Sequence, residues 1–198
     1  ILAYAEYFYR PFGADVGFDP ELAVYQEDYP RIRIKNAITL TSLDLATAAY
    51  TPTHWQRSTF PVAYGQKIRV IHDGIDTAML HRNSSARFRL PNGRFLTCER
   101  PVITLRAQML ELFPTDFSRV HFFPALDRNS YIAMLQLSAC HVYLTYPFVP
   151  SWSLVEALSC GTPVVATNVA PVREIVGNET CRLVDFFDIE VLAKTMEK

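Results

Sequence analysis

The chain has 198 residues, 49% of them hydrophobic, which is enough to bury a core in one large domain or two small ones. Its 19 basic and 20 acidic side chains give a net charge of -1 and form no basic run, which argues against nucleic acid as the main partner. No apolar run approaches the roughly 20 residues that span a bilayer, and no charged-then-apolar leader opens the chain, so we expect a cytoplasmic protein.

The first part of the chain predicts an aromatic, turn-rich opening and then regular elements. Residues 1–29 are typical of an irregular surface segment, because glycine and proline interrupt the aromatic residues. Residues 31–50 predict a helix that runs into a short buried strand near 46–50. Four residues fall near one face of that helix: Ile34, Ile38, Ser42 and Leu45.

A second helix and a strand are expected next. Thr53 and Gln56 have the spacing of a capping box, which predicts a helix start, and Pro61 predicts its end. The stretch "KIRVIHDGID" alternates apolar and polar residues up to Asp73-Gly74, and this pattern predicts a strand that ends in a tight turn.

The second half of the chain alternates strands with helices. We interpret the polar stretch 81–100, with its Pro91-Asn92-Gly93 turn, as a linker between two lobes. Beyond it we expect strands at 101–105, 120–124, 141–145, 163–167 and 181–184, and helices at 106–113, 129–139, 153–159, 171–176 and 188–198. Such alternation indicates a parallel sheet covered on both faces, and therefore a Rossmann-like α/β domain.

The four cysteines do not have the pattern of a metal site. They form no CxxC pair and have no metal-type spacing with the five histidines. We therefore predict buried free thiols in a reducing compartment, with no metal bound.

The turn that leads into the helix at Ser153 is the strongest candidate for a binding site. In an open parallel sheet, ligands bind beyond the carboxyl ends of the strands, where helix starts present free N–H groups. Ser151, Trp152 and Ser153 would offer such groups to a phosphate. Ser153 and Glu156 also have the spacing of a capping box, and the residues taken alone favour that structural role for Glu156.

Three stretches resemble the family-4 (group 1) retaining glycosyltransferases: "SWSLVEALSCGTPVVATNVAPVREIV", "QKIRVIHDGID" and "TPTHWQRSTFP". That family has the GT-B fold, in which two Rossmann-like lobes face each other. The resemblance covers nearly the whole chain, and the motifs occur in the family's order. It implies that residues 1–80 are the tail of an acceptor-side lobe, 81–100 a linker, and 101–198 the Rossmann-like parallel-sheet domain that binds the nucleotide sugar.

The resemblance also implies a role for Glu156. In the family a Glu-x7-Glu motif spans the strand-to-helix turn, and its second glutamate, which binds the donor ribose, corresponds to Glu156. The residues between the two, including Ser151, Trp152 and Ser153, would offer backbone N–H groups to phosphate and sugar. The first glutamate corresponds to Phe148, although one branch of the family also lacks that carboxylate.

Three further residues are secondary candidates. The family's glycine-containing loop and its diphosphate-binding cation are absent, so a βα stretch is expected to be missing near 105–106, and Arg106 is the nearest substitute for the cation. Glu174 is expected in the first turn of its helix, where a carboxylate complements the helix dipole, and the resemblance implies a place near the donor. His72 precedes a turn that lies near the cleft in the family.

The resemblance implies a transferase that moves a sugar from a nucleotide-diphosphate sugar to a glycan or lipid-linked acceptor with retention, without metal or other cofactor. A lipid-linked acceptor would allow peripheral contact at the inner face of the membrane. The alternative is a truncated, catalytically inactive relative with at most weak nucleotide binding. A nucleotide-sugar epimerase on the same fold would require carboxylates facing the sugar, and we find none in the sequence.

Overall fold

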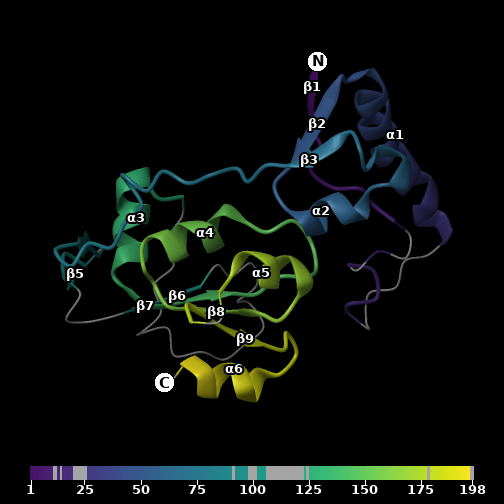
Figure 1. Cartoon of the computed structure of the whole chain (residues 1–198). Helices are drawn as coiled ribbons and strands as arrows, with labels where there is room; N and C mark the ends of the chain where they lie inside the picture. Colours follow the sequence, from purple (N-terminus) through teal and green to yellow (C-terminus); the bar gives the residue numbers. More distant parts are fainter. Residues whose placement is uncertain are drawn as a thin grey trace. The chain divides into compact units, whose positions relative to one another are not determined.

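The computed structural model describes residues 1–10, 13, 15–19, 26–90, 92–97, 102–105, 123, 125–177 and 179–196 (Figure 1). This part of the chain forms two compact units. The first consists of Ile1–Gly74, Thr145–Ser151 and Thr167–Gly177, and the second of Ile75–Leu144, Trp152–Ala166 and Asn178–Lys198. Arg106, the helix predicted at 106–113 and, apart from Phe123, the strand predicted at 120–124 lie outside the described residues.

The first unit contains a three-stranded parallel sheet in the order β1-β2-β3. Its strands are β1 (Leu2–Tyr4), β2 (Ala48–Thr51) and β3 (Ile68–Val70), and its helical segments are η1 (Gln26–Asp28), α1 (Tyr29–Leu45), α2 (His54–Thr59) and η2 (Val62–Tyr64). The core of this unit is Ala5, Leu43, Ala49, Phe60 and Ile68. The strands predicted near 46–50 and 68–70 are therefore confirmed, whereas β1 lies in a segment predicted as irregular.

Strand β1 forms because its backbone completes the edge of the sheet. Leu2 is in register with Ala48, and the N–H of Ala5 donates to the carbonyl of Tyr50 at 2.8 Å. The glycine and proline signals that predicted an irregular segment begin after Arg10, beyond the strand.

Helix α1 is present as predicted, but the apolar face expected from the sequence is not the one that it buries. Ile34, Ile38 and Leu45 are 67–72% exposed, whereas Asn36 and Leu43 are buried. The Asn36 amide fixes this orientation, because Nδ2 donates to the carbonyl of Tyr9 at 2.6 Å and Oδ1 accepts from its N–H at 3.0 Å.

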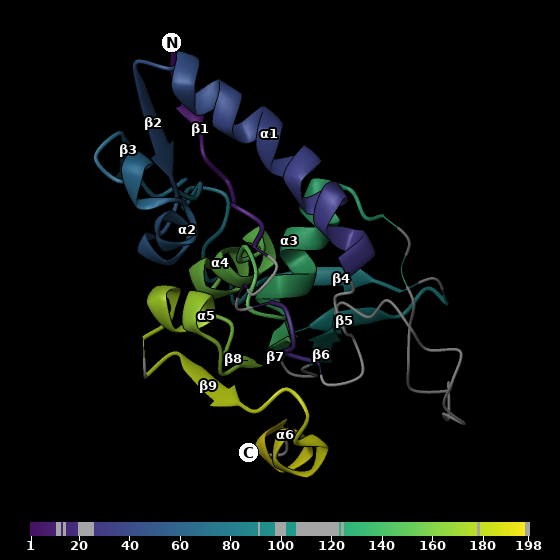
Figure 2. The ribbon, with the colours of Figure 1, turned by 90° about the vertical axis from the view of Figure 1, so that its right-hand side faces the viewer.

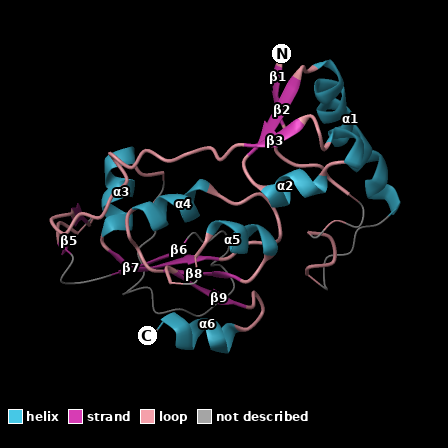
Figure 3. Ribbon diagram, viewed as in Figure 1, coloured by secondary structure: helices cyan, strands magenta, loops and turns pink. Residues whose placement is uncertain are grey.

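The second unit is built on a four-stranded sheet in the order β6-β7-β8-β9 (Figure 3). Its strands are β6 (Val102–Leu105), β7 (Ser138–Tyr143), β8 (Val164–Thr167) and β9 (Cys181–Val184), and β6, β7 and β8 pair in parallel. The helices of this unit are α3 (Arg128–Gln136), α4 (Trp152–Ser159) and α6 (Ile189–Met196), whereas α5 (Ala170–Ile175) belongs to the segment of the first unit that follows β8. The alternation confirms a Rossmann-like α/β fold.

The last helix covers one side of this sheet. Helix α6 lies beside β9 in both Figure 1 and Figure 2, and its Leu192 and Met196 pack against a cluster of buried strand residues. That cluster consists of Cys140, Val142, Val165 and Val184.

The stretch interpreted as a linker contains regular structure. Strands β4 (Arg87–Arg89) and β5 (Phe95–Thr97) pair in an antiparallel hairpin. Gly93 makes the turn with a φ of 83°, a conformation that glycine adopts without steric cost. Phe88 and Leu90 pack with Leu137 in a core cluster, so the hairpin is a packed element of the second unit.

Candidate functional site

The connection from β7 to α4 leads through Thr145–Ser151, which packs with the first unit, to a helix that begins at Trp152. Glu156 is thus the fifth residue of α4, two positions beyond the third residue, from which a glutamate reaches back to the helix start in a capping box. The structural role predicted for Glu156 from its spacing with Ser153 is therefore wrong.

Glu156 instead contacts two side chains of α3. Its Oε1 accepts a hydrogen bond from Nη1 of Arg128 at 2.6 Å, and its Oε2 accepts one from the hydroxyl of Tyr131 at 2.7 Å. Glu156 is only 6% exposed, so the ion pair with Arg128 offsets part of the cost of burying a charge. Both carboxylate oxygens are fixed by neighbouring side chains.

Helix α3 places the two partners together because they are three residues apart and share one face. The side chain of Asp127 caps this helix by accepting from the N–H of Ser130 at 3.0 Å, which fixes where the first turn begins. Neither Arg128 nor Tyr131 was identified from the sequence as a partner of Glu156. The i, i+3 spacing marks the shared face but does not say which carboxylate it meets.

The electrostatics of this cluster keep its donors protonated. The hydrogen bond to Glu156 raises the pKa of Arg128, and burial together with the same carboxylate raises the pKa of the Tyr131 hydroxyl. Burial, with Glu156 nearby, also raises the pKa of the Cys160 thiol to about 11, so that thiol is a poor nucleophile at neutral pH.

Phe148 lies in an aromatic cluster of the first unit. Its ring meets Tyr7 edge-on at 4.7 Å between centroids and lies 6.1 Å from Tyr9. Tyr7 in turn stacks against Trp55 at 5.8 Å. The hydroxyl of Tyr7 donates to Asp15 at 2.8 Å. Burial, together with this hydrogen bond, raises the pKa of Tyr7. The sequence did not indicate that these rings meet Phe148.

Glu174 caps a different helix from the one predicted. It is the fifth of six residues in α5, not a residue of its first turn. Its two carboxylate oxygens accept from the backbone N–H groups of His54 and Trp55 at 2.6 and 2.7 Å. These N–H groups open α2 and have no acceptor within that helix, so the carboxylate satisfies them and complements the helix dipole.

The remaining candidates among the described residues are His72, Ser151, Trp152 and Ser153. His72 is exposed, and its Nδ1 accepts from the N–H of Gly74 at 3.0 Å within the local turn. Ser151 and Ser153 are half-buried on either side of Trp152, which is 54% exposed. In the described ranges no three His, Cys, Asp or Glu side chains gather in a way that could hold a metal ion.

Three of the cysteines, Cys140, Cys160 and Cys181, are buried and free, as predicted. None of the helices formed by the described residues is both long enough and apolar enough to cross a bilayer.

Two family models match the chain. Residues 1–80 match a model described as glycosyl transferase family 4 group, and residues 105–198 match one described as glycosyl transferases group 1. The first match includes α1, α2 and the sheet of the first unit, and the second includes Arg128, Tyr131 and Glu156. No curated protein matches the chain.

Proposed function

Because the chain is a family-4-like protein of the group 1 glycosyltransferases, we propose that it transfers a sugar from a nucleotide-diphosphate sugar to a glycan or lipid-linked acceptor with retention. The domains of this group support sugar transfer in general. The observation that supports a donor site on this chain is the buried Glu156 carboxylate, fixed through both oxygens. A lipid-linked acceptor would bring the protein to the inner face of a membrane.

In this proposal Glu156 binds the ribose of the donor. A carboxylate has about four lone-pair positions, and Arg128 and Tyr131 each use one, so two remain for the neighbouring hydroxyls of a ribose. Arg128 and Tyr131 are positioning residues, because they stop the carboxylate from rotating before the ligand arrives. Preorganisation of this kind reduces the entropy lost on binding.

The start of α4 would hold the diphosphate. Ser151, Trp152 and Ser153 are the residues at this start, and the eight-residue helix directs its dipole toward them. As the glycosidic bond breaks, negative charge develops on the leaving diphosphate, and backbone N–H groups at a helix start stabilise such charge.

A second candidate function is nucleotide binding without transfer. By the resemblance to the family's motif, Phe148 corresponds to the first glutamate, and its ring packs edge-on against Tyr7. A phenyl ring cannot accept a hydrogen bond from a sugar hydroxyl. This alternative predicts binding of the donor but no turnover.

Calorimetry with UDP, GDP, ADP and their sugars tests the donor site. We expect the wild type to bind one of these series and Glu156→Gln to bind it at least about tenfold more weakly, because the ribose hydroxyls then no longer donate to a charged group. Glu179→Gln, an exposed carboxylate elsewhere, is the matched control and should bind like the wild type. Absence of nucleotide binding by folded wild-type protein would refute the assignment.

Transfer is tested separately with a panel of glycan and lipid-linked acceptors. Product whose new bond keeps the donor's anomeric configuration supports the retaining transferase. Donor binding with no product from any acceptor selects the second candidate.

A further inference from the structure

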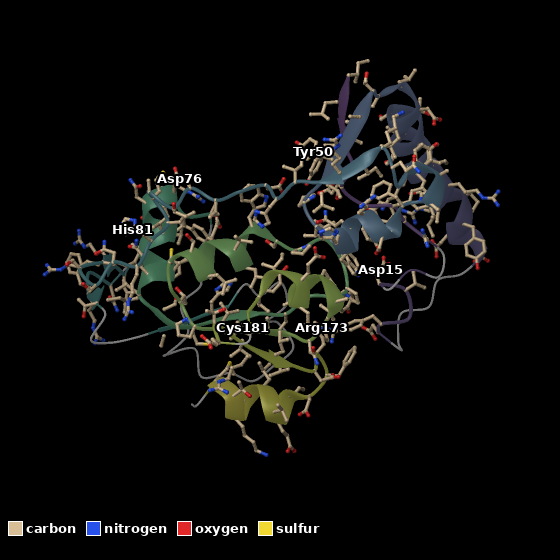
Figure 4. All side chains as sticks on the ribbon, viewed as in Figure 1. Asp15, Tyr50, Asp76, His81, Arg173 and Cys181 are labelled. Atoms are coloured by element: carbon tan, nitrogen blue, oxygen red, sulfur yellow. The ribbon has the colours of Figure 1, made fainter. Side chains whose placement is uncertain are left out.

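The β4–β5 hairpin concentrates positive charge in a chain that is nearly neutral. Residues 81–97 include Arg82, Arg87, Arg89 and Arg94 and no Asp or Glu, whereas the whole chain has a net charge of -1. Figure 4 shows nitrogen-tipped side chains extending outward around the hairpin, close to the labelled His81. Arginine is the residue that best suits paired hydrogen bonding to phosphate or carboxylate groups.

A pocket of about 540 Å³ lies between β4 and α3. Its apolar lining consists of Phe88, Phe123, Leu126 and Ala133. Its polar lining consists of Arg87, Arg89, Asn129 and Ser130. The rings of Phe88 and Phe123 meet edge-on at 5.2 Å, which gives the pocket an aromatic wall beside the two arginines.

The two arginines are available to a ligand. Arg87 and Arg89 are exposed, and the structure gives neither guanidinium a hydrogen bond or ion pair with another described residue. The acid that precedes α3, Asp127, accepts from the backbone N–H of Ser130 and so caps that helix. The pocket therefore combines apolar surface with cationic groups that, among the described residues, have no anionic partner.

This pocket is separate from the Glu156 cluster. Successive residues of an α-helix are about 100° apart, so Asn129, Ser130 and Ala133 lie on the opposite face of α3 from Arg128 and Tyr131. Arg128 is bound to Glu156 on that other face. A ligand in the pocket would thus leave the proposed donor site unoccupied.

We propose that the pocket binds a phosphate ester carried on an apolar or aromatic body. The guanidinium groups of Arg87 and Arg89 would bind the phosphate, because charge-assisted pairs of this kind are the strongest hydrogen bonds available to a side chain. The Phe88, Phe123 and Leu126 surface would bury the body of the ligand. A lipid phosphate and a nucleoside monophosphate share this chemistry.

Calorimetry in a buffer of physiological ionic strength tests the proposal with four probes: octyl phosphate, uridine monophosphate, inorganic phosphate and 1-octanol. We expect at least one of the first two to bind more tightly than inorganic phosphate or octanol, because only they carry both groups. Preference for octyl phosphate identifies a lipid phosphate as the source, and preference for uridine monophosphate identifies a nucleotide. If neither binds, the proposal is wrong.

Two double variants distinguish specific binding in the pocket from a general effect of positive charge on the hairpin. Arg87→Gln/Arg89→Gln should weaken binding about 100-fold, because each guanidinium that no longer pairs with the phosphate reduces affinity about tenfold. Arg82→Gln/Arg94→Gln removes the same charge outside the pocket lining and should change affinity by less than about threefold, because screened charges at a distance contribute little. Equal reductions in affinity by both variants would overturn the proposal.

Two single variants complete the test. Ala133→Leu should weaken the preferred ester but leave inorganic phosphate binding unchanged, since it fills only the apolar part of the pocket. Glu156→Gln should leave binding of octyl phosphate unchanged, and any uridine monophosphate binding that this variant weakens is assigned to the donor site, which separates failure here from failure of the proposed donor site. Circular dichroism of each variant establishes that it is folded.

Discussion

The carboxylate of Glu156 is held by two donors that differ in kind. Arg128 supplies a charge but is about half exposed, with 48% of its side chain accessible, so solvent screens its contribution. Tyr131 is less exposed than Arg128, and its hydroxyl donates a neutral hydrogen bond. Removing either donor leaves one buried carboxylate oxygen without that hydrogen bond. The free-energy cost of an unsatisfied buried oxygen is larger than the net contribution of the hydrogen bond to stability.

Replacing Tyr131 with Phe should lower the free energy of unfolding by about 1–2 kcal/mol, because Oε2 of Glu156 is then left without its hydroxyl donor in a buried position. Urea denaturation followed by circular dichroism measures this change. If nucleotide binds at Glu156, the same variant should also weaken it, since the carboxylate can then rotate. Tyr64→Phe is the matched control, because the Tyr64 hydroxyl bonds Asp44 at the exposed surface and its removal should have a much smaller effect. Equal destabilisation by both variants would contradict this account.

The residue-level predictions from the sequence failed where they depended on distant partners. The spacing of Ser153 and Glu156 is compatible with a helix cap only if the helix begins after Ser153, and it begins at Trp152. The sequence contains no information on which side chains 25 or 28 positions away will meet Glu156. Capping by Thr53 was predictable because its partner, Gln56, is local.

Among the elements, α2 depends most clearly on partners from elsewhere in the chain. Thr53 accepts from the N–H of Gln56 at 3.0 Å, and Glu174 accepts from the N–H groups of His54 and Trp55. A six-residue helix is too short to be stable by itself, so these hydrogen bonds and packing must hold it.

Glu174→Ala should therefore loosen the start of α2. We expect a decrease of about 0.5–1 kcal/mol in the free energy of unfolding, at the low end for a helix cap because Glu174 is exposed. Hydrogen exchange measured by NMR is the sharper test, since the amides of His54 and Trp55 should become less protected before the rest of the first unit. Glu179→Ala serves as the control, and unchanged protection in Glu174→Ala would show that the carboxylate is not the acceptor in solution.

Elements with a clear periodic pattern were predicted close to their observed bounds. Strands β8 and β9 and helices α4 to α6 lie at the expected positions, whereas β7 begins at Ser138, within the last residues of the helix predicted at 129–139, so α3 ends earlier than expected. The β4–β5 hairpin was missed because each of its strands has only three residues and lies among polar turn residues. The buried face of α1 was predicted wrongly because it is set by a polar residue, Asn36. The amide of Asn36 binds the backbone of Tyr9 through both its oxygen and its nitrogen.

At the scale of the whole molecule, the two compact units are not consecutive in sequence. Thr145–Ser151 and Thr167–Gly177 pack with the first 74 residues, and the bond from His54 to Glu174 joins residues 120 positions apart. Periodicity describes only local neighbours, so it cannot reveal such long-range pairing. The Rossmann-like class could be predicted from the sequence, but this distribution of segments could not.

The three described cysteines report on the second unit as a whole. Cys140, Cys160 and Cys181 lie on β7, α4 and β9 or at their ends, and all are buried. In a Cys98→Ser background these three thiols should react with a disulfide reagent at mildly alkaline pH only as fast as the second unit opens, since the folded thiols are both covered and protonated. Addition of concentrated urea should give immediate reaction. Rapid reaction of the native protein would show that this sheet is open in solution.

Stability should also fall at high pH. Burial raises the pKa of Cys160 and of Cys181 from an ordinary value of 9.0 to about 11. The unfolded chain then loses these protons at lower pH than the folded one, so their stabilising effect is complete below pH 9 and disappears as the pH rises to about 11. Urea midpoints measured across this range should fall in the Cys98→Ser background, and Cys160→Ala/Cys181→Ala should show a shallower fall. An identical slope in the two proteins would mean that other groups control alkaline unfolding.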